Sequence, residues 1–285
     1  MIYMPQDSKT SKRMGLAFFL NAGFTVIEII GGILTGSIAI VADAIHDFGD
    51  TLSLGASWLL EKKSNKGATE KYPFGYKRFS LLGALLSGTV LISGSLYIFY
   101  EAGKRLLDPV SPHSDGMMWL AILGVLVNGF AALKLRHGEG LNSKMLSWHL
   151  LEDVLGWIAV LVVSIILQFK DIPILDPLLS IGITIYILFH VVKNLKKTLL
   201  ILLESAPEGV DLDAVKSKIL NKPRVIDIQK MKLWSLDGKE NAAMIHLLVE
   251  NMEPEESDQL RSEIREFLET EKISDSTLEL NYEKS

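Results

Sequence analysis

The chain has 285 residues, 48% of them hydrophobic, and a mean hydropathy of +0.27. This composition is unusual for a soluble protein with an ordinary polar surface, so part of the chain is expected to lie in lipid. Residues 204–285 carry 19 acidic and 11 basic side chains, and this acidic balance argues against nucleic acid as a partner. The sequence has no cysteine, which excludes disulfides and thiolate metal sites.

Six segments before residue 204 are apolar enough to cross a bilayer, whose hydrocarbon core requires about 20 residues per helix. They lie at 14–36, 38–60, 79–102, 117–135, 146–168 and 173–195. The first segment could instead be a signal peptide, because Lys9, Lys12 and Arg13 precede it, but its apolar run exceeds the usual length of about 7–15 residues. We therefore expect a transmembrane domain over residues 1–203 and a soluble domain over 204–285.

The lysines and arginines that flank these segments predict the orientation of the chain, since cytoplasmic loops carry the excess of basic residues. Fifteen of them lie in the N-terminal tail, in the loops after the second and fourth segments and at the end of the sixth. The opposite side has only Lys104, Arg105 and Lys170. Both termini and the soluble domain are therefore expected in the cytoplasm, with the spans in the cell membrane.

Four ionisable residues fall inside the second segment, in the string VADAIHDFGD: Asp43, His46, Asp47 and Asp50. At 100° per residue they lie within an arc of about 100° on one helix face. Such residues are costly in a membrane and mark functional sites by default. Asp43 and Asp47 flank His46 and are interpreted either as a relay for the ion or as acceptors of hydrogen bonds from its ligands.

The fifth segment repeats the pattern in SWHLLEDVLGW, where His149 and Asp153 stand one turn apart. Two such pairs on facing helices would present two imidazole nitrogens and two carboxylate oxygens to one point, which suits tetrahedral Zn²⁺. The predicted metal ligands are therefore His46, Asp50, His149 and Asp153. The alternative is a set of interhelical hydrogen bonds or ion pairs, although the first, second and fifth segments contain no Lys or Arg.

A site of this kind couples metal to protons, because imidazole must be neutral to bind a metal ion. Loading from one side and unloading by protons on the other would exchange the two ions without ATP, and the chain has no Walker A string. Two other classes remain: an intramembrane metalloenzyme, which would need an open coordination position and for which the HExxH string is missing, and a membrane metal sensor.

The soluble part reads as a helix (211–221), two strands (225–235 and 240–250), a helix (254–270) and a strand (276–283). DGKE supplies a hairpin turn between the first two strands. A three-stranded sheet packed on two helices leaves one face or edge in need of a partner. This αββαβ domain is therefore predicted to form dimer contacts.

The segments GSIAIVADAIHDFGD, YPFGYKRFS, HLLEDVLGW and LLESAP resemble the corresponding signatures of the cation diffusion facilitator family of metal/proton antiporters. The resemblance implies a homodimer with six spans per protomer, a metallochaperone-like cytoplasmic domain and alternating access. It assigns the transported ion to the same four ligands, and His at position 46 is associated with a preference for Zn²⁺ over Cd²⁺ or Mn²⁺. Export of another ion, such as Cd²⁺, Co²⁺, Fe²⁺ or Mn²⁺, remains an alternative.

The sequence also departs from the pattern of some relatives. A second metal site before the third span is not expected, because Tyr72 and Tyr76 occupy the matching positions. His246 alternates with apolar neighbours and is interpreted as a strand histidine rather than a strong ligand. Arg78 and Glu204 match positions that form an ion pair in some relatives, so they are expected to lie close together; alternatively, Arg78 anchors the third span to lipid headgroups.

Overall fold

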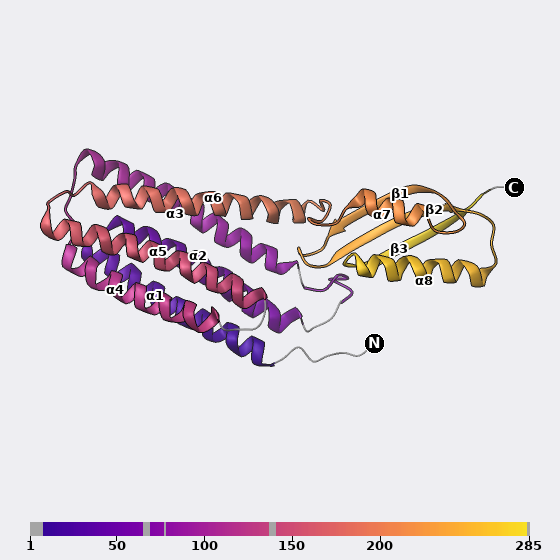
Figure 1. The fold of residues 1–285 in the computed structure, drawn as a ribbon, viewed down its shortest axis with the longest axis horizontal. Helices are drawn as coiled ribbons and strands as arrows, with labels where there is room; N and C mark the ends of the chain where they lie inside the picture. Colours follow the sequence, from indigo (N-terminus) through magenta and orange to yellow (C-terminus); the bar gives the residue numbers. More distant parts are fainter. Residues whose placement is uncertain (1–7, 65–68, 77, 137–140, 284–285) are drawn as a thin grey trace. The chain divides into compact units, whose positions relative to one another are not determined.

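The computed structural model describes the backbone of residues 8–64, 69–76, 78–136 and 141–283. It divides into two compact units, one formed by residues 1–61 and 85–194 and the other by residues 62–84 and 195–285. The first unit contains most of the length of six long helices, and the second contains two shorter helices and a sheet (Figure 1).

Six helices correspond one to one with the six predicted apolar segments. They are α1 (Ser8–Thr35), α2 (Ile38–Ser64), α3 (Phe79–Leu107), α4 (Ser114–Arg136), α5 (Leu141–Phe169) and α6 (Leu175–Leu202). Five of them, all except α2, are long and apolar enough to cross a membrane. The exception has a chemical cause, since three carboxylates fall within a stretch of eight residues of α2.

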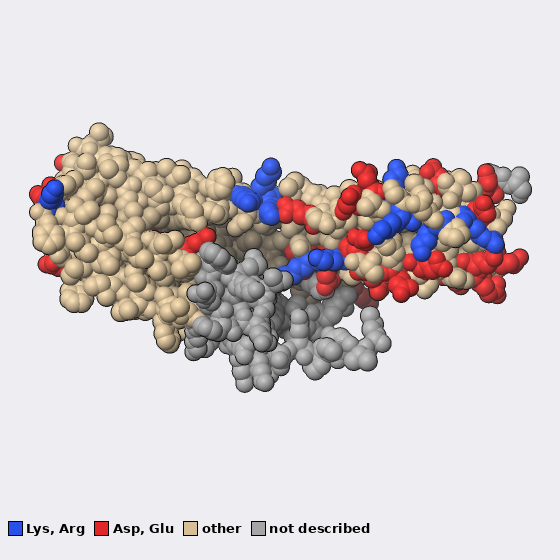
Figure 2. Space-filling view, viewed as in Figure 1, with Lys and Arg blue, Asp and Glu red and all other residues tan. Residues whose placement is uncertain are grey.

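The outer faces of the helical unit are apolar. Large side chains such as Leu34, Leu96, Phe130 and Phe189 are more than 60% exposed. Figure 2 shows a broad surface of the helices with hardly any charged side chain, whereas Lys, Arg, Asp and Glu cover the α/β unit densely. Apolar patches of this extent are not stable against water in a monomeric soluble protein and indicate a lipid environment.

The centre of the helical unit is packed around Trp157 of α5, which is 1% exposed. Its neighbours in the buried cluster include Phe24 of α1, Ile40 of α2 and Met117 of α4. Gly124 of α4 permits this packing, because a Cβ atom there would lie only 2.2 Å from the Trp157 ring. The indole therefore packs directly against the backbone of α4 and brings α4 and α5 close together.

The second unit contains α7 (Leu212–Leu220), β1 (Val225–Ser235), β2 (Asn241–Val249), α8 (Pro254–Thr270) and β3 (Ile273–Tyr282). This confirms the predicted order of helices and strands, although β3 begins three residues earlier than expected. The strands lie in the order β1-β2-β3, with β1 antiparallel and β3 parallel to β2. The predicted hairpin turn joins β1 to β2, and Gly238 takes a positive φ of 89° there.

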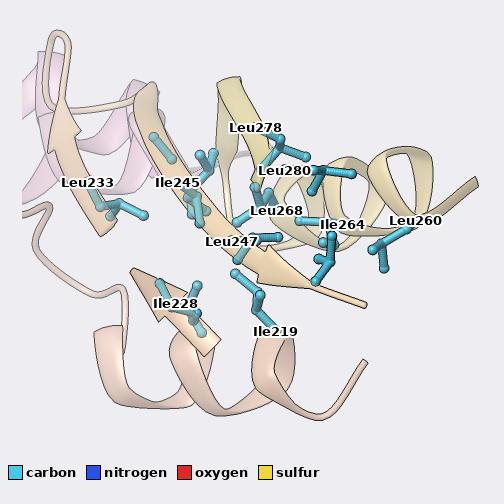
Figure 3. Packing of buried hydrophobic residues seen from close by; sticks show 14 residues of the cluster. Ile219, Ile228, Leu233, Ile245, Leu247, Leu260, Ile264, Leu268, Leu278 and Leu280 are labelled. Atoms are coloured by element: carbon cyan, nitrogen blue, oxygen red, sulfur yellow. The ribbon is translucent and has the colours of Figure 1, made fainter. Parts of the chain in front are cut away.

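One apolar core, drawn from all five elements, holds the α/β unit together (Figure 3). Alternation along β2 points Ile245 and Leu247 into this core, where both are completely buried. Ile219 comes from α7, and Ile264 from α8. The alternation turns the intervening residue His246 to the other face of the sheet.

Ion pairs reinforce the packing of α8 against the segment around α7. Lys222 donates a hydrogen bond to Glu263 at 3.1 Å, and Arg224 donates to Glu256 at 2.6 Å. Hydrogen bonds from Lys222 and Gln259 lower the pKa of Glu263. These pairs lie at the surface, where water screens them, so the apolar core supplies most of the stability.

Candidate metal site

Helix α2 brings three potential metal ligands to one point. His46, Asp47 and Asp50 each offer a ligand atom, and these atoms lie within 4.8 Å of one another. His46 Nε2 is 3.7 Å from Asp50 Oδ2. The cause is helical geometry, since residues four apart stack on one face and a residue beside the first is turned by only 100°.

The cluster is sheltered but not sealed. The side chains of His46 and Asp50 are 22% and 25% exposed, whereas Asp47 is 5% exposed. An ion could therefore reach the histidine and the outer carboxylate while the third ligand stays buried. Nitrogen and oxygen donors of this kind bind Zn²⁺ and its neighbours among the divalent transition metals.

Helix α5 contributes Asp153 beside this cluster but not within it. Asp153 is close enough to Asp43 and Asp47 to interact with both electrostatically. The two helices approach at Gly156, where a Cβ atom would lie 3.8 Å from Asp43 Oδ1. His149 lies on α5 one turn before Asp153, but its side chain is outside the described residues. The described part of the predicted four-ligand set is thus a pair on α2 with a nearby carboxylate on α5.

Hydrogen bonds from neighbouring helices fix α2 at the level of the cluster. Asn21 of α1 donates to the carbonyl oxygen of Asp47 at 3.1 Å and to the Thr51 hydroxyl at 2.9 Å. From α3, the Ser87 hydroxyl donates to the carbonyl oxygen of Gly49 at 2.7 Å. The backbone on both sides of the ligands is therefore held from two directions, which preorganises the site.

Glu28 of α1 adds a further carboxyl group beside the site. It is 1% exposed, and its neighbours include Asp43 and Asp47. No Lys or Arg lies between Ile38 and Leu60 of α2, or between Gly15 and Thr35 of α1, to neutralise these acids. Such a group of carboxyl groups at low dielectric attracts either protons or a cation.

The sequence did not reveal that Asp47 belongs to the ligand cluster, and left it as either an ion relay or an acceptor of hydrogen bonds from the ligands. The i, i+4 pattern selects His46 and Asp50, whereas a residue at i+1 is turned partly aside. The only available signal was the density of acids on one face. The structure makes Asp47 a third candidate ligand on α2.

The structure also describes the surroundings of two other positions discussed from the sequence. Tyr72 and Tyr76 lie with their ring centroids 4.9 Å apart, and both pack against Phe79, so aromatic rings occupy the segment where some relatives have a second metal. His246 pairs with Glu279 on the neighbouring strand, with Nδ1 and Oε2 3.3 Å apart. This contact gives the strand histidine an acidic partner on β3.

Comparison with known protein families finds a match for each of two regions of the chain. Residues 14–203 match the cation efflux transmembrane domain, and residues 207–278 match the cytoplasmic domain of cation efflux proteins. The chain belongs to the cation efflux family. The resemblance to metal antiporters noted from the sequence is confirmed, and this member of the cation efflux family is a multi-pass membrane protein.

Characterised relatives match over nearly the whole length. The "Cadmium, cobalt and zinc/H(+)-K(+) antiporter" of Bacillus subtilis is 30% identical and aligns with 97% of this chain and 91% of its own. "Zinc transporter ZitB" of Pectobacterium atrosepticum is 31% identical over 98% of this chain and 88% of its own. The protein of the same name from Escherichia coli is 29% identical over 99% and 90%. These alignments therefore extend over both family regions of this cation efflux protein.

We predict that Asp50→Ala and Asp153→Ala each weaken zinc binding by at least about 100-fold, because substitutions of groups that merely support metal ligands already cost about 10–100-fold. Each change also leaves one negative charge fewer to balance a divalent ion. The measurement is zinc titration of the purified full-length protein. Asp171→Ala, in the exposed loop before α6, is the matched control and is expected to bind zinc normally. Near-normal binding by the Asp50 or Asp153 variant would exclude that residue as a ligand.

Proposed function

We propose that this cation efflux protein exports a divalent metal ion, with Zn²⁺ preferred, from the cytoplasm in exchange for protons. The observation that carries the proposal is the His46, Asp47 and Asp50 cluster, which lies on one face of a helix inside the membrane domain. A permanent metal centre would need ligands that enclose the ion, whereas this cluster stays partly accessible. Partial access suits an ion that must enter and leave.

The proposed coordination sphere is His46 and Asp50 from α2 with His149 and Asp153 from α5. Four ligands complete a tetrahedron for Zn²⁺ and leave no open position for a reacting water, which favours transport over hydrolysis. Two carboxylates balance the two charges of the ion and reduce the cost of holding it away from water. The zinc names of the Pectobacterium and Escherichia relatives support the preference for this ion.

Proton exchange follows from the same ligands, because imidazole must be deprotonated before it binds metal. An acidic outer compartment would protonate the ligands and release the ion. The name of the Bacillus subtilis relative pairs metal ions with H(+) and K(+) in an antiporter, which supports exchange of a metal ion for protons. The same name includes cadmium and cobalt, so a wider range of divalent ions is the second candidate for the substrate.

The proposed topology has six spans in the cell membrane, with α2 as the second. The low apolarity of α2 is consistent with a span that faces the interior of a bundle, since Asn21 and Ser87 of neighbouring helices bond to its backbone. Basic residues in the flanking loops support cytoplasmic termini. On this proposal residues 1–203 form the membrane domain and residues 204–285 the cytoplasmic domain.

The proposed assembly is a homodimer that works by alternating access. The cytoplasmic domain has a three-stranded sheet with two open edges, β1 and β3, and an outer face that is not part of its core. A partner copy would cover such surfaces. We propose a metallochaperone-like fold for this domain, which its order of helices and strands supports, and a role in joining protomers without any chemistry of its own.

Zinc uptake into proteoliposomes tests the proposed function. With an acidic lumen, zinc should enter faster than without a pH gradient, and a protonophore should remove the difference because it collapses the driving force. Empty liposomes are the control. Equal uptake with and without the gradient would contradict proton exchange, and no uptake in either condition would contradict transport and favour a sensor.

His46→Asp tests the choice of ion. Replacing the imidazole with a carboxylate removes a nitrogen ligand that favours zinc, so the ratio of Cd²⁺ to Zn²⁺ transport should rise several-fold. Competition between the two ions in the same uptake assay measures the ratio. An unchanged ratio would show that His46 does not set the preference for Zn²⁺ over Cd²⁺. Asp108→Ala, at an exposed position after α3, is the control for the effect of a substitution as such.

Substitutions of Arg78 and Glu204 test whether the start of α3 and the end of α6 are coupled to the cytoplasmic domain. Arg78 Nη1 lies 3.5 Å from Glu204 Oε1, which confirms that the two residues are close, and Arg78 Nε donates to the carbonyl oxygen of Leu236 at 3.1 Å. The ion pair is partly exposed and worth only about 0–1 kcal/mol. That is too little to hold the fold, but enough to bias states that differ by a few kcal/mol.

Arg78→Glu should therefore reduce transport several-fold while lowering the melting temperature little, and adding Glu204→Arg should restore part of the activity. Full recovery is not expected, because a side chain at position 204 cannot reproduce the bond from position 78 to Leu236. Lys170→Glu, in the loop before α6, is the control. A double variant as inactive as the single one would favour a role for Arg78 in lipid anchoring alone.

A further inference from the structure

A buried carboxylate from α6 holds the first turn of α2. Asp176 lies in the first turn of α6 and is 0% exposed. Its Oδ2 accepts a hydrogen bond from the backbone N–H of Ile38 at 2.7 Å, and its Oδ1 accepts one from the N–H of Ala39 at 3.3 Å. The Ser37 hydroxyl donates to Oδ1 at 2.5 Å. One side chain thus satisfies two of the amides that a helix leaves free at its N-terminus.

The remaining bonds complete the arrangement. The Ser37 oxygen accepts from the N–H of Ile40 at 3.2 Å, which is the usual contact of a serine N-cap. Arg105 of α3 donates to the carbonyl oxygen of Gly36, immediately before the helix. The first three amides of α2 are therefore all bonded, and the chain just before them is held by a third helix.

The tie between α2 and α6 cannot loosen at low cost. Moving Asp176 away would leave a buried carboxylate without its donors and would also expose two backbone N–H groups to an apolar environment. The positive end of the α2 dipole adds to the attraction. The contact therefore fixes the end of α2 relative to α6, and not only the conformation of its first turn.

We propose that Asp176 is a positioning residue for the metal site: by tying the first turn of α2 to α6, it sets the direction in which α2 presents His46 and Asp50. This inference rests on the proposed function of that site. His46 lies nine residues beyond Ser37, about 14 Å along the helix. A tilt of about 5° at the tied end would move the imidazole by about 1 Å, well beyond the roughly 0.2 Å tolerance of metal–ligand distances.

A simpler role would be local capping, in which Asp176 only stabilises the first turn. The two roles separate if the carboxylate is moved from α6 to α2 itself. In Ser37→Asp combined with Asp176→Ala, an aspartate at the N-cap can bond the first-turn amides, because Asp is as good an N-cap as Ser. The hydrogen bonds from α6 are then absent, and only the apolar packing between α2 and α6 remains. Capping is restored while positioning is not.

The experiment measures two quantities on purified full-length protein: zinc affinity by titration with the metal alone, and hydrogen exchange of peptides covering residues 36–45. The variants are Asp176→Ala, the isosteric Asp176→Asn and the double variant. Asp171→Asn is the matched control, since Asp171 accepts a hydrogen bond from Ser111 in exposed loops away from α2. Size-exclusion chromatography verifies that each variant keeps the assembly of the wild type.

We expect Asp176→Ala to bind zinc at least ten-fold more weakly and to exchange its first-turn amides at least ten-fold faster than wild type. Asp176→Asn should lose less zinc affinity and less protection from exchange, because its amide oxygen still accepts a hydrogen bond while its NH₂ group faces N–H donors. If the alanine variant does not fold, the asparagine variant decides the question. The double variant should regain slow exchange but not zinc affinity.

Wild-type zinc affinity in the double variant would overturn the proposal in favour of local capping, and so would zinc affinity within two-fold of wild type in the Asp176→Ala variant. Fast exchange of the first-turn amides in the wild-type protein would contradict the tie itself, whatever the protein binds. If the wild type binds no zinc, the proposed function fails instead, and the exchange data alone then accept or reject the tie.

Discussion

The placement of several acids on one face of a helix within an apolar bundle constrains the rest of this structure. Each carboxylate costs about 2.5–3.5 kcal/mol at the centre of a membrane helix on insertion scales. Asp43, Asp47 and Asp50 share α2, and no Lys or Arg between Ile38 and Leu60 offsets them. This acidic face of α2 is stable in the membrane only if it points away from lipid and binds cations or protons. A site that exchanges the two is a direct chemical consequence.

The surrounding helices hold α2 at several heights. Asp176 binds its first turn, and Asn21 and Ser87 bond to its backbone beside the ligands. These contacts use polar groups that would otherwise be costly in the interior, so each stabilises the fold and orients the site at once. The rigid side of the site is thus α2 with its neighbours, while Asp153 on α5 stands outside the 4.8 Å cluster. If α5 supplies ligands as proposed, a movement of α5 relative to α2 would open or close the coordination sphere.

Much of the fold was predictable from the sequence, because long apolar runs specify membrane helices and strict alternation specifies strands. The residues of β2 show why: Ile245 and Leu247 had to face one core, which left His246 on the other face. The parallel pairing of β3 with β2 was not predictable, since it depends on how α8 crosses the sheet. Asp176 was missed for a similar reason, because its partners Ser37 and Ile38 lie more than 130 residues away.

The four-ligand set was predicted from spacing and is a proposal in both halves, on α2 and on α5. The spacing identifies His46 and Asp50 as a pair on one face, but spacing within one helix says nothing about how closely a second helix approaches. Tertiary packing decides that distance through residues such as Gly156 and Trp157. Asp47 was missed for a different reason, since the i, i+4 pattern selects His46 and Asp50 and leaves out the residue next to His46.

X-ray absorption at the zinc edge on the full-length protein, loaded with one zinc per protomer, tests the central claim most directly. The account predicts four nitrogen or oxygen ligands at about 2.0–2.1 Å, with the outer-atom scattering of two imidazoles, because His46 and His149 both bind the ion. Substituting His46→Ala should reduce the imidazole number to one. A spectrum without imidazole scattering, or one unchanged by that substitution, would contradict a transport site built from α2 and α5.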